Sequence, residues 1–161
     1  MARIRGERQA TVMQSGRAKA YRPLPVEARA AAVQEGLEAY GRGDAFQAHE
    51  LLEPAWMGTA DQAERELLQG LIKLAAGYVH AARDNALGVA KNLTGAREHL
   101  AAAEAATLAG GTIAIPELAS IAVPRLIGAI DRVLAQVARD GDVPLGRPTI
   151  RHRAREDTRD R

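Results

Sequence analysis

The sequence contains no cysteine, which excludes a disulfide framework, a thiolate nucleophile and any metal or iron–sulfur site built on Cys ligands. Only 3% of the 161 residues are aromatic. Ala and Leu supply most of the 47% that is hydrophobic, a composition that favours helices over strands. No apolar run is long enough to cross a bilayer, and no signal-peptide core follows the N-terminal arginines. We therefore expect a cytoplasmic protein with no membrane partner.

Several sequence motifs of common enzymes are also missing. The chain has no Gly-rich phosphate loop of the Walker type and no nucleophile elbow. Serine is scarce, so a Ser-His-acid triad has little support. The length suits one domain with a sizeable core.

The charge is divided unevenly along the chain. The whole chain carries +2, of which residues 1–22 carry +5 and residues 147–161 carry +3, so residues 23–146 carry −6. We predict a basic disordered arm (1–22), a helical domain (23–146) and an Arg-rich disordered tail (147–161). Nucleic acid could bind both ends electrostatically. A folded nucleic-acid binder, however, usually carries its basic stripe on the fold itself.

Apolar residues recur at steps of three and four, which predicts an all-α, compact bundle of about five helices. The third helix is apolar on nearly all sides between Leu67 and Val79, so we expect it to be the buried central helix. Gly70 and Gly77 share one of its faces, and we expect the helix bearing His49 to approach there. Pro54 predicts a kink or an early end of the second helix. The predicted helices cover about 25–41, 44–58, 61–84, 89–108 and 123–140, with a short turn of helix after Pro116.

The segment from His49 to Trp56 concentrates polar groups within eight residues. On a helix His49, Glu53 and Trp56 share one face, while Glu50 projects about 100° away from His49. The simplest interpretation is a hydrogen-bonded pair of His49 and Glu53 beside Trp56, inside the bundle.

A metal site is the alternative interpretation of this segment. Its spacing is similar to the His-Glu-x-x-His helix of zinc proteases, with Glu53 in place of the second His. His49 and Glu53 would then be ligands of a divalent metal, His80 the candidate third ligand, and Glu50 the candidate catalytic base. Without such a metal we expect no cofactor.

Gln69 and His80 lie eleven residues apart in the third helix, about 16 Å along its axis. They cannot share one metal ion but could line one groove. Alternatively, Gln69 is a buried amide and His80 a capping or core imidazole. We expect His99 to be solvated, and His152 lies in the predicted tail.

Residues 43–88 resemble a bacterial and archaeal family known as domain of unknown function 309. The resemblance implies a compact all-helical bundle and brings no established activity with it. It covers less than a third of the chain. It rests on Phe46, His49, Glu50, Glu53, Trp56, Gln69, Gly70, Leu71, Ile72, His80, Asn85 and Gly88.

Three functions are therefore open. The first is a non-enzymatic structural or binding module whose polar cluster is buried or lines a groove. The second is a metal-dependent, hydrolase-like enzyme, and the third is a nucleic-acid-associated protein that binds through its basic ends. The flat faces of Ala-rich helices are compatible with a homodimer. The predicted cluster comprises His49, Glu50, Glu53, Trp56, Gln69, His80 and Asn85.

Overall fold

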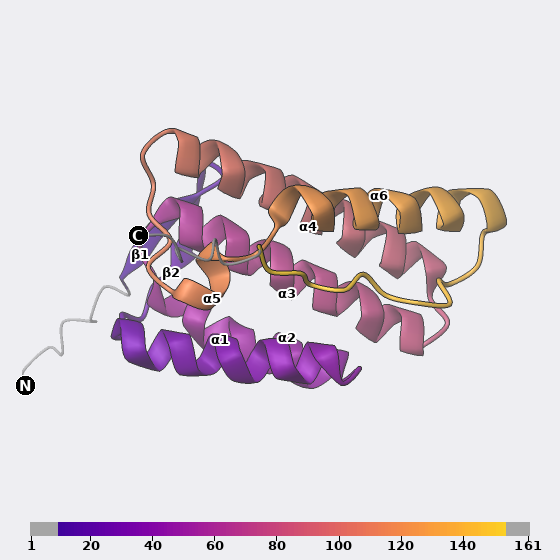
Figure 1. Ribbon diagram of the computed structural model, residues 1–161, viewed down its shortest axis with the longest axis horizontal. Helices are drawn as coiled ribbons and strands as arrows, with labels where there is room; N and C mark the ends of the chain where they lie inside the picture. Colours follow the sequence, from indigo (N-terminus) through magenta and orange to yellow (C-terminus); the bar gives the residue numbers. More distant parts are fainter. Residues whose placement is uncertain (1–9, 154–161) are drawn as a thin grey trace, which may run out of the picture.

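The computed structural model describes residues 10–153, and these form a helical bundle with one small hairpin at its side (Figure 1). The all-α prediction is confirmed. The described residues hold six helices, of which α5 is the short turn expected after Pro116. The elements are β1 (Thr11–Gln14), β2 (Arg17–Ala20), α1 (Val26–Gly41), α2 (Ala45–Gly58), α3 (Gln62–Ala82), α4 (Ala86–Leu108), α5 (Pro116–Ala119) and α6 (Val123–Asp140).

Side-chain caps fix where three of the helices begin. Asp44 accepts from the Gln47 amide at the start of α2, and Asp61 accepts from two amides at the start of α3. Asn85 accepts from the Gly88 amide, so α4 begins at residue 86 rather than at the predicted 89. The helix α2 continues past Pro54 to Gly58, so it has no early end, and the alternative of a kink at Pro54 stays a prediction.

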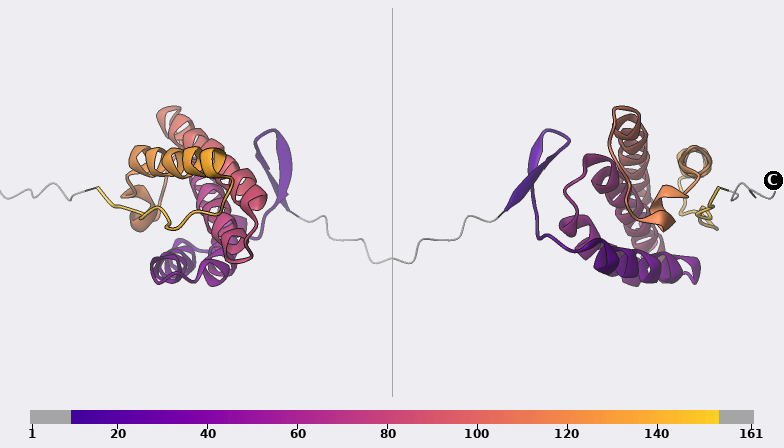
Figure 2. Two further views of the ribbon diagram at one scale, coloured as in Figure 1. Left: turned by 90° about the vertical axis from the view of Figure 1, so that its right-hand side faces the viewer. Right: turned by 60° about the vertical axis from the view of Figure 1, so that its left-hand side comes forward.

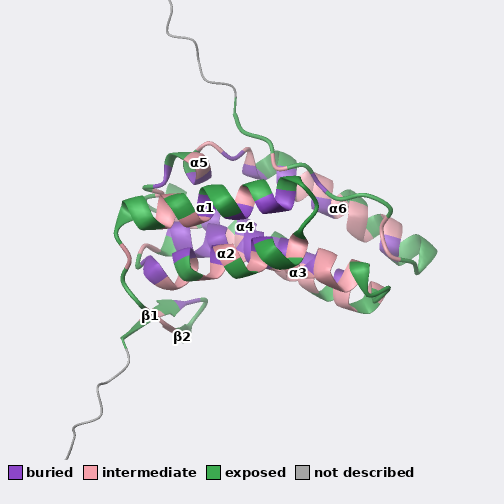
Figure 3. Cartoon of the chain, turned by 90° about the horizontal axis from the view of Figure 1, so that it is seen from below, coloured by how far each residue is buried: buried purple, intermediate pink, exposed green. Residues whose placement is uncertain are grey.

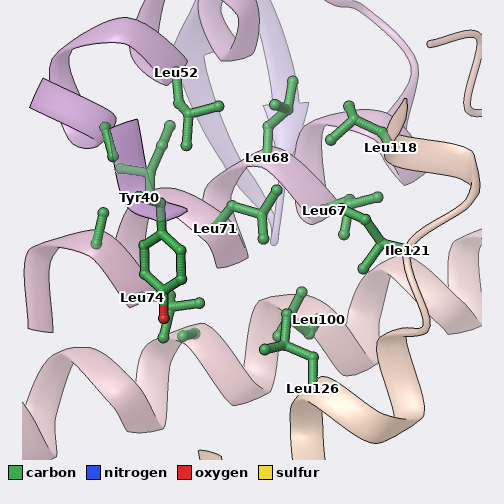
Figure 4. Packing of buried hydrophobic residues seen from close by; sticks show 14 of the residues in the cluster. Tyr40, Leu52, Leu67, Leu68, Leu71, Leu74, Leu100, Leu118, Ile121 and Leu126 are labelled. Carbon is green, nitrogen blue, oxygen red and sulfur yellow. The ribbon is translucent and has the colours of Figure 1, made fainter. Parts of the chain in front are cut away.

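The central position predicted for α3 is confirmed. Twelve of its 21 residues are buried, and it packs between α2 on one side and α4 on the other. Its leucines project into the core (Figure 4). There they are surrounded by Tyr40 from α1, Leu52 from α2, Leu100 from α4 and Leu126 from α6. Figure 3 shows that buried residues gather on the inward faces of the helices.

The glycines of α3 do allow close helix approach, but the partner is α4 and not the helix bearing His49. A Cβ at Gly70 would lie 2.8 Å from Leu100 Cγ, and one at Gly77 would lie 3.0 Å from Leu93 Cδ2. The prediction chose the wrong neighbour because periodicity shows which face is bare and does not show which helix covers it. The α1–α2 contact has its own glycine, Gly36, against Leu52.

Residues 10–22 are ordered, so the prediction of a disordered arm is wrong for this part of the chain. Strands β1 and β2 pair antiparallel around Ser15 and Gly16, which both adopt positive φ in a two-residue hairpin turn. The hairpin stands at one side of the bundle, against the start of α3 (Figure 2). Since an isolated hairpin is marginal in water, its order depends on this docking. Residues 1–9 lie outside the described residues.

The C-terminal strap, residues 142–153, runs back along α6 (Figure 1). Tyr40 and Tyr78 donate their hydroxyls to the Pro148 and Gly146 carbonyls, at 2.6 and 3.0 Å. Burial raises the pKa of Tyr40, so this hydroxyl keeps its proton. His152 Nδ1 lies 2.6 Å from Ser120 Oγ. The predicted disorder is therefore wrong for residues 147–153, because partners from distant parts of the fold hold this segment. Residues 154–161 lie outside the described residues.

None of the helices in residues 10–153 combines the length and the apolar character that a membrane span needs.

Candidate functional site

Two groups of polar side chains lie near the α2–α3 connection, and they differ in burial. The interior cluster comprises Gln14, Ser15, Trp56, Glu64, Arg65, Glu66 and His99, and its three consecutive charged residues in α3 are at most 1% exposed. The α2 cluster comprises His49, Glu50 and Glu53. There the side chains of His49 and Glu50 are 32% and 51% exposed. The sequence predicted a pair of His49 and Glu53 inside the bundle, whereas the buried charged residues are those of the interior cluster.

Arg65 is the centre of the interior cluster and is 0% exposed. Its Nη1 donates to the carbonyls of Trp56 and Thr59, both at 2.9 Å, and its Nη2 donates to the Ala20 carbonyl at 3.4 Å. Burial lowers the pKa of Arg65, and the adjacent Glu66 carboxylate opposes that change. One guanidinium thus joins the last turn of α2, the α2–α3 loop and strand β2.

Trp56 connects the motif of α2 to the hairpin. The Arg65 guanidinium lies 4.6 Å from the centroid of the Trp56 ring, in cation–π geometry. The indole Nε1 donates to Gln14 Oε1 at 3.0 Å, and Gln14 Nε2 donates to the Arg65 carbonyl at 3.5 Å. Gln14 is 1% exposed. The ring of Trp56 therefore packs on Arg65 of the interior cluster and, through Gln14, holds β1 against the bundle.

Glu66 joins the hairpin to α4. Its Oε1 accepts from Ser15 Oγ at 2.9 Å, and its Oε2 lies 2.6 Å from His99 Nδ1. Burial raises the pKa of this carboxyl, but the hydrogen bonds from His99 and Ser15 outweigh burial and lower it below 4.5. The prediction that His99 is solvated is wrong. Arg97 and Glu98 precede it in sequence, yet its face of α4 meets the buried carboxylate of α3.

Glu64 makes a third link across the bundle. Its Oε2 accepts from Arg29 Nε at 3.1 Å, and its Oε1 accepts from the Ala114 amide at 3.2 Å. These partners come from α1 and from the segment before α5. The side chain does not return to the Asp61 cap, as a capping box would require. Each carboxylate in the interior cluster thus has polar partners, which is typical of buried charges that hold a fold together.

We expect Glu66 to make the stability of the protein depend on acid. Because its folded-state pKa is lowered, its contribution is present above pH 4.5 and is lost as the pH falls through the folded-state value. Glu66→Gln should reduce the free energy of unfolding at pH 7 by about 1–3 kcal/mol. The variant should also lose less stability than the wild type between pH 7 and acid. Urea unfolding followed by the fluorescence of Trp56 measures both, and equal acid losses would contradict this role.

The α2 cluster brings three potential ligands together on two turns of helix. His49 Nδ1 lies 3.4 Å from Glu50 Oε1. The prediction paired His49 with Glu53, but its partner in the structure is Glu50. One ligand atom from each of His49, Glu50 and Glu53 lies within 4.8 Å of the others. The Cβ directions of His49 and Glu50 do diverge, but both side chains are long enough to meet.

A groove adjoins the α2 cluster, between α2 and the segment that leads into α1. Its volume is about 500 Å³. Apolar side chains form most of the wall, and two carboxylates and one guanidinium supply the charges. The lining residues are Arg22, Pro23, Leu24, Glu50, Glu53, Pro54 and Met57.

His80 is not among the residues whose ligand atoms group with those of His49, so its predicted role as a third ligand stays a prediction. The Nδ1 atom of His80 lies 3.1 Å from the side-chain Nδ2 of Asn85, the residue that caps α4. Gly88 leaves room for the ring, because a Cβ there would lie 2.5 Å from His80 Nδ1. Gln69 is half-buried. Its predicted roles, as a buried amide or in a groove with His80, stay predictions.

Sequence reasoning missed the interior cluster, although one signal for it exists. Arg65 precedes Leu68 and Ile72 by three and seven residues, which places it on the buried stripe of α3. Yet residues 61–64 indicate a helix start, and charged residues are common there for reasons unrelated to burial. No local pattern, however, could have identified Gln14, Ser15 or His99 as partners.

Residues 33–92 match the model of the family described as Domain of unknown function (DUF309). The match includes all of α2 and α3 and the start of α4. The hairpin and the C-terminal strap lie outside it. No curated protein and no solved structure matches the chain.

Proposed function

The chain therefore belongs, through residues 33–92, to the family described as Domain of unknown function (DUF309), and from this premise we propose that it is a non-enzymatic binding module. The site of binding is the groove beside α2, with the carboxylates of Glu50 and Glu53 at its wall.

One observation carries this proposal: the polar residues of the motif divide into those used within the protein and those that face a hollow. Trp56 bonds Gln14, and His80 bonds the Asn85 cap. Among residues 10–153, the Glu50 carboxylate hydrogen-bonds only its neighbour His49 in the same helix, and both Glu50 and Glu53 line the groove. Carboxylates that stabilised the fold would be expected to have the kind of partners that Glu64 and Glu66 have.

The chemistry of the groove indicates a ligand with a cationic group on an apolar body. Pro23, Leu24 and Met57 offer apolar surface, which supplies most of the affinity of a small site. The two carboxylates would fix a positively charged group. A basic residue flanked by apolar ones in a peptide has this form.

A divalent cation is the second candidate ligand, favoured by the 4.8 Å grouping of His49, Glu50 and Glu53. Zinc bonds of about 2.0–2.2 Å would need the ligand atoms closer, about 3.3–3.6 Å apart, which these partly exposed side chains can reach by changing rotamer. If Glu50 is a ligand, however, it cannot also be the free general base of a hydrolase. The cluster thus fits metal binding better than metal-dependent hydrolysis.

NMR titration of isotope-labelled protein with two probes tests both candidates. A synthetic peptide with one Arg between Leu residues should shift the amides of Leu24, Glu53 and Met57. Glu53→Gln should weaken its binding by about tenfold. Glu35→Gln, which removes an equal charge from the exposed side of α1, should not.

Zinc ion is the second probe. Saturable shifts around His49 that disappear in His49→Ala, with no response to the peptide, would replace the first candidate by the second. Peptide binding that Glu35→Gln weakens as much as Glu53→Gln would contradict a defined site.

A further inference from the structure

A second groove lies between α6 and the C-terminal strap, on elements that do not line the groove beside α2. Its volume is about 620 Å³. Arg125 and Arg132 line it from α6, and Arg147 and Arg151 line it from the strap. No Asp or Glu is among the described residues that line it. We call it the arginine groove.

The fold sets the positions of these arginines before any ligand arrives. Arg125 and Arg132 are seven residues apart, which places them on one face of α6. Hydrogen bonds hold the strap opposite them in place, among them those from Tyr40 Oη to the Pro148 carbonyl and from the Ala122 amide to the Arg151 carbonyl. Figure 1 shows the strap lying beside α6 along much of that helix. A preorganised site of this kind loses less freedom on binding.

Gly128 keeps part of the groove open. Glycine is a poor helix former, and Gly36 and Gly70 are explained by leucine side chains within 3.0 Å of where a Cβ would be. A Cβ at Gly128 would meet only Arg132 Nη1, at 3.7 Å. No neighbouring helix therefore requires the glycine, and a side chain there would occupy space within the groove.

The guanidinium groups of the groove have few partners of opposite charge. Arg29, Arg97 and Arg139, elsewhere in the fold, each pair with a carboxylate. Arg147 donates to the carbonyls of Tyr40 and Gly41. No carboxylate lies within ion-pair distance of Arg125, Arg132 or Arg151 among residues 10–153. Like charges gathered around a hollow repel one another, and an anion in the hollow would relieve that repulsion.

The form of the groove indicates which anion it suits. Guanidinium groups bind phosphate through paired N–H donors, and several around one hollow suit more than one phosphoryl group. No aromatic ring lines the groove, so it lacks the stacking platforms of single-strand nucleic-acid sites. Its volume is that of a small-molecule site. We propose that the arginine groove binds the di- or triphosphate group of a small phosphorylated molecule.

This site is independent of the groove beside α2, so either proposal can fail without the other. Isothermal titration of the full chain with inorganic tripolyphosphate, at low and at physiological salt, tests it. We expect saturable binding to one site that weakens as salt rises. Arg125→Ala and Arg132→Ala should each weaken it by about tenfold. Gly128→Leu, which fills the groove and keeps every charge, should abolish it while circular dichroism shows an intact helical fold.

Arg139→Ala is the matched control, because Arg139 is on the same helix, is 70% exposed and lies outside the groove. It should leave binding unchanged. Equal losses in Arg139→Ala and Arg132→Ala would overturn the proposal by showing attraction to net charge alone. Undiminished binding by Gly128→Leu would overturn the location. Adenosine triphosphate and a single-stranded RNA oligonucleotide complete the set of probes. Binding of the RNA without binding of tripolyphosphate would overturn the proposal in favour of a nucleic-acid surface.

Discussion

Replacing Arg65 with alanine is expected to lower the free energy of unfolding by about 3–5 kcal/mol, the loss typical of breaking a buried charged network. The guanidinium is 0% exposed and donates to the carbonyls of Trp56, Thr59 and Ala20. Without it these three carbonyls would lose a buried hydrogen-bond donor. Urea unfolding monitored by circular dichroism measures the change.

Two further variants make the result specific to the interior cluster. Arg65→Lys keeps the charge but cannot reproduce the planar fork of donors, so most of the stability should still be lost. Arg97→Ala removes an arginine from an exposed ion pair with Asp131 and should leave the melting temperature nearly unchanged. A wild-type unfolding curve for Arg65→Ala would mean that the three carbonyls find other partners at little cost.

The same substitution, glycine to alanine, should have opposite effects at two positions of the α3–α4 pair. At Gly70 the new methyl would lie 2.8 Å from Leu100 Cγ and 3.3 Å from the Ala96 carbonyl oxygen. We expect a net loss of about 1–3 kcal/mol from overpacking. At Gly95 the nearest atom is Lys73 Cδ at 3.5 Å, so there we expect a gain of up to about 1 kcal/mol from helix propensity.

A double variant tests the physical cause at Gly70. Leu100→Ala removes the side chain that the new methyl would meet, so Gly70→Ala should cost much less in that background. Thermal melting of the single and double variants gives the coupling. Losses that simply add would show that Leu100 is not the obstacle. A stabilising Gly70→Ala would show that α3 and α4 can separate without cost.

The interior cluster and the two grooves divide the polar chemistry of this protein by role. Buried charges at the start of α3 have protein partners on the hairpin, α1 and α4, which is the arrangement that stabilises a fold. The α2 cluster and the arginine groove present charge to a hollow instead. Opposite signs at the two grooves indicate ligands of opposite charge. Cytoplasmic location and a homodimer stay predictions.

Local sequence determined the helices. The apolar period marked each helix that packs in the core, Asp44 and Asp61 marked two helix starts as predicted, and the apolar length of α3 marked it as central. These features depend on residues within a few turns of one another, so local reasoning can find them. The hairpin also has a local signal, the Ser15-Gly16 turn, but four-residue strands are too short to be stable without a docking surface.

The tertiary structure alone decided which residues meet. The sequence shows that Gly70 leaves space on one face of α3. Only the packing of the helices shows that the Leu100 side chain occupies this space. The sequence predicts that His99 is solvated, but in the fold it lies 2.6 Å from Glu66 of α3. The sequence places Arg147 in a disordered tail, but in the fold Tyr40 holds the strap that contains it. Backbone periodicity fixes the direction of each side chain relative to its own helix. The partner in each case is set by contacts between residues far apart in sequence, which only the folded chain brings together.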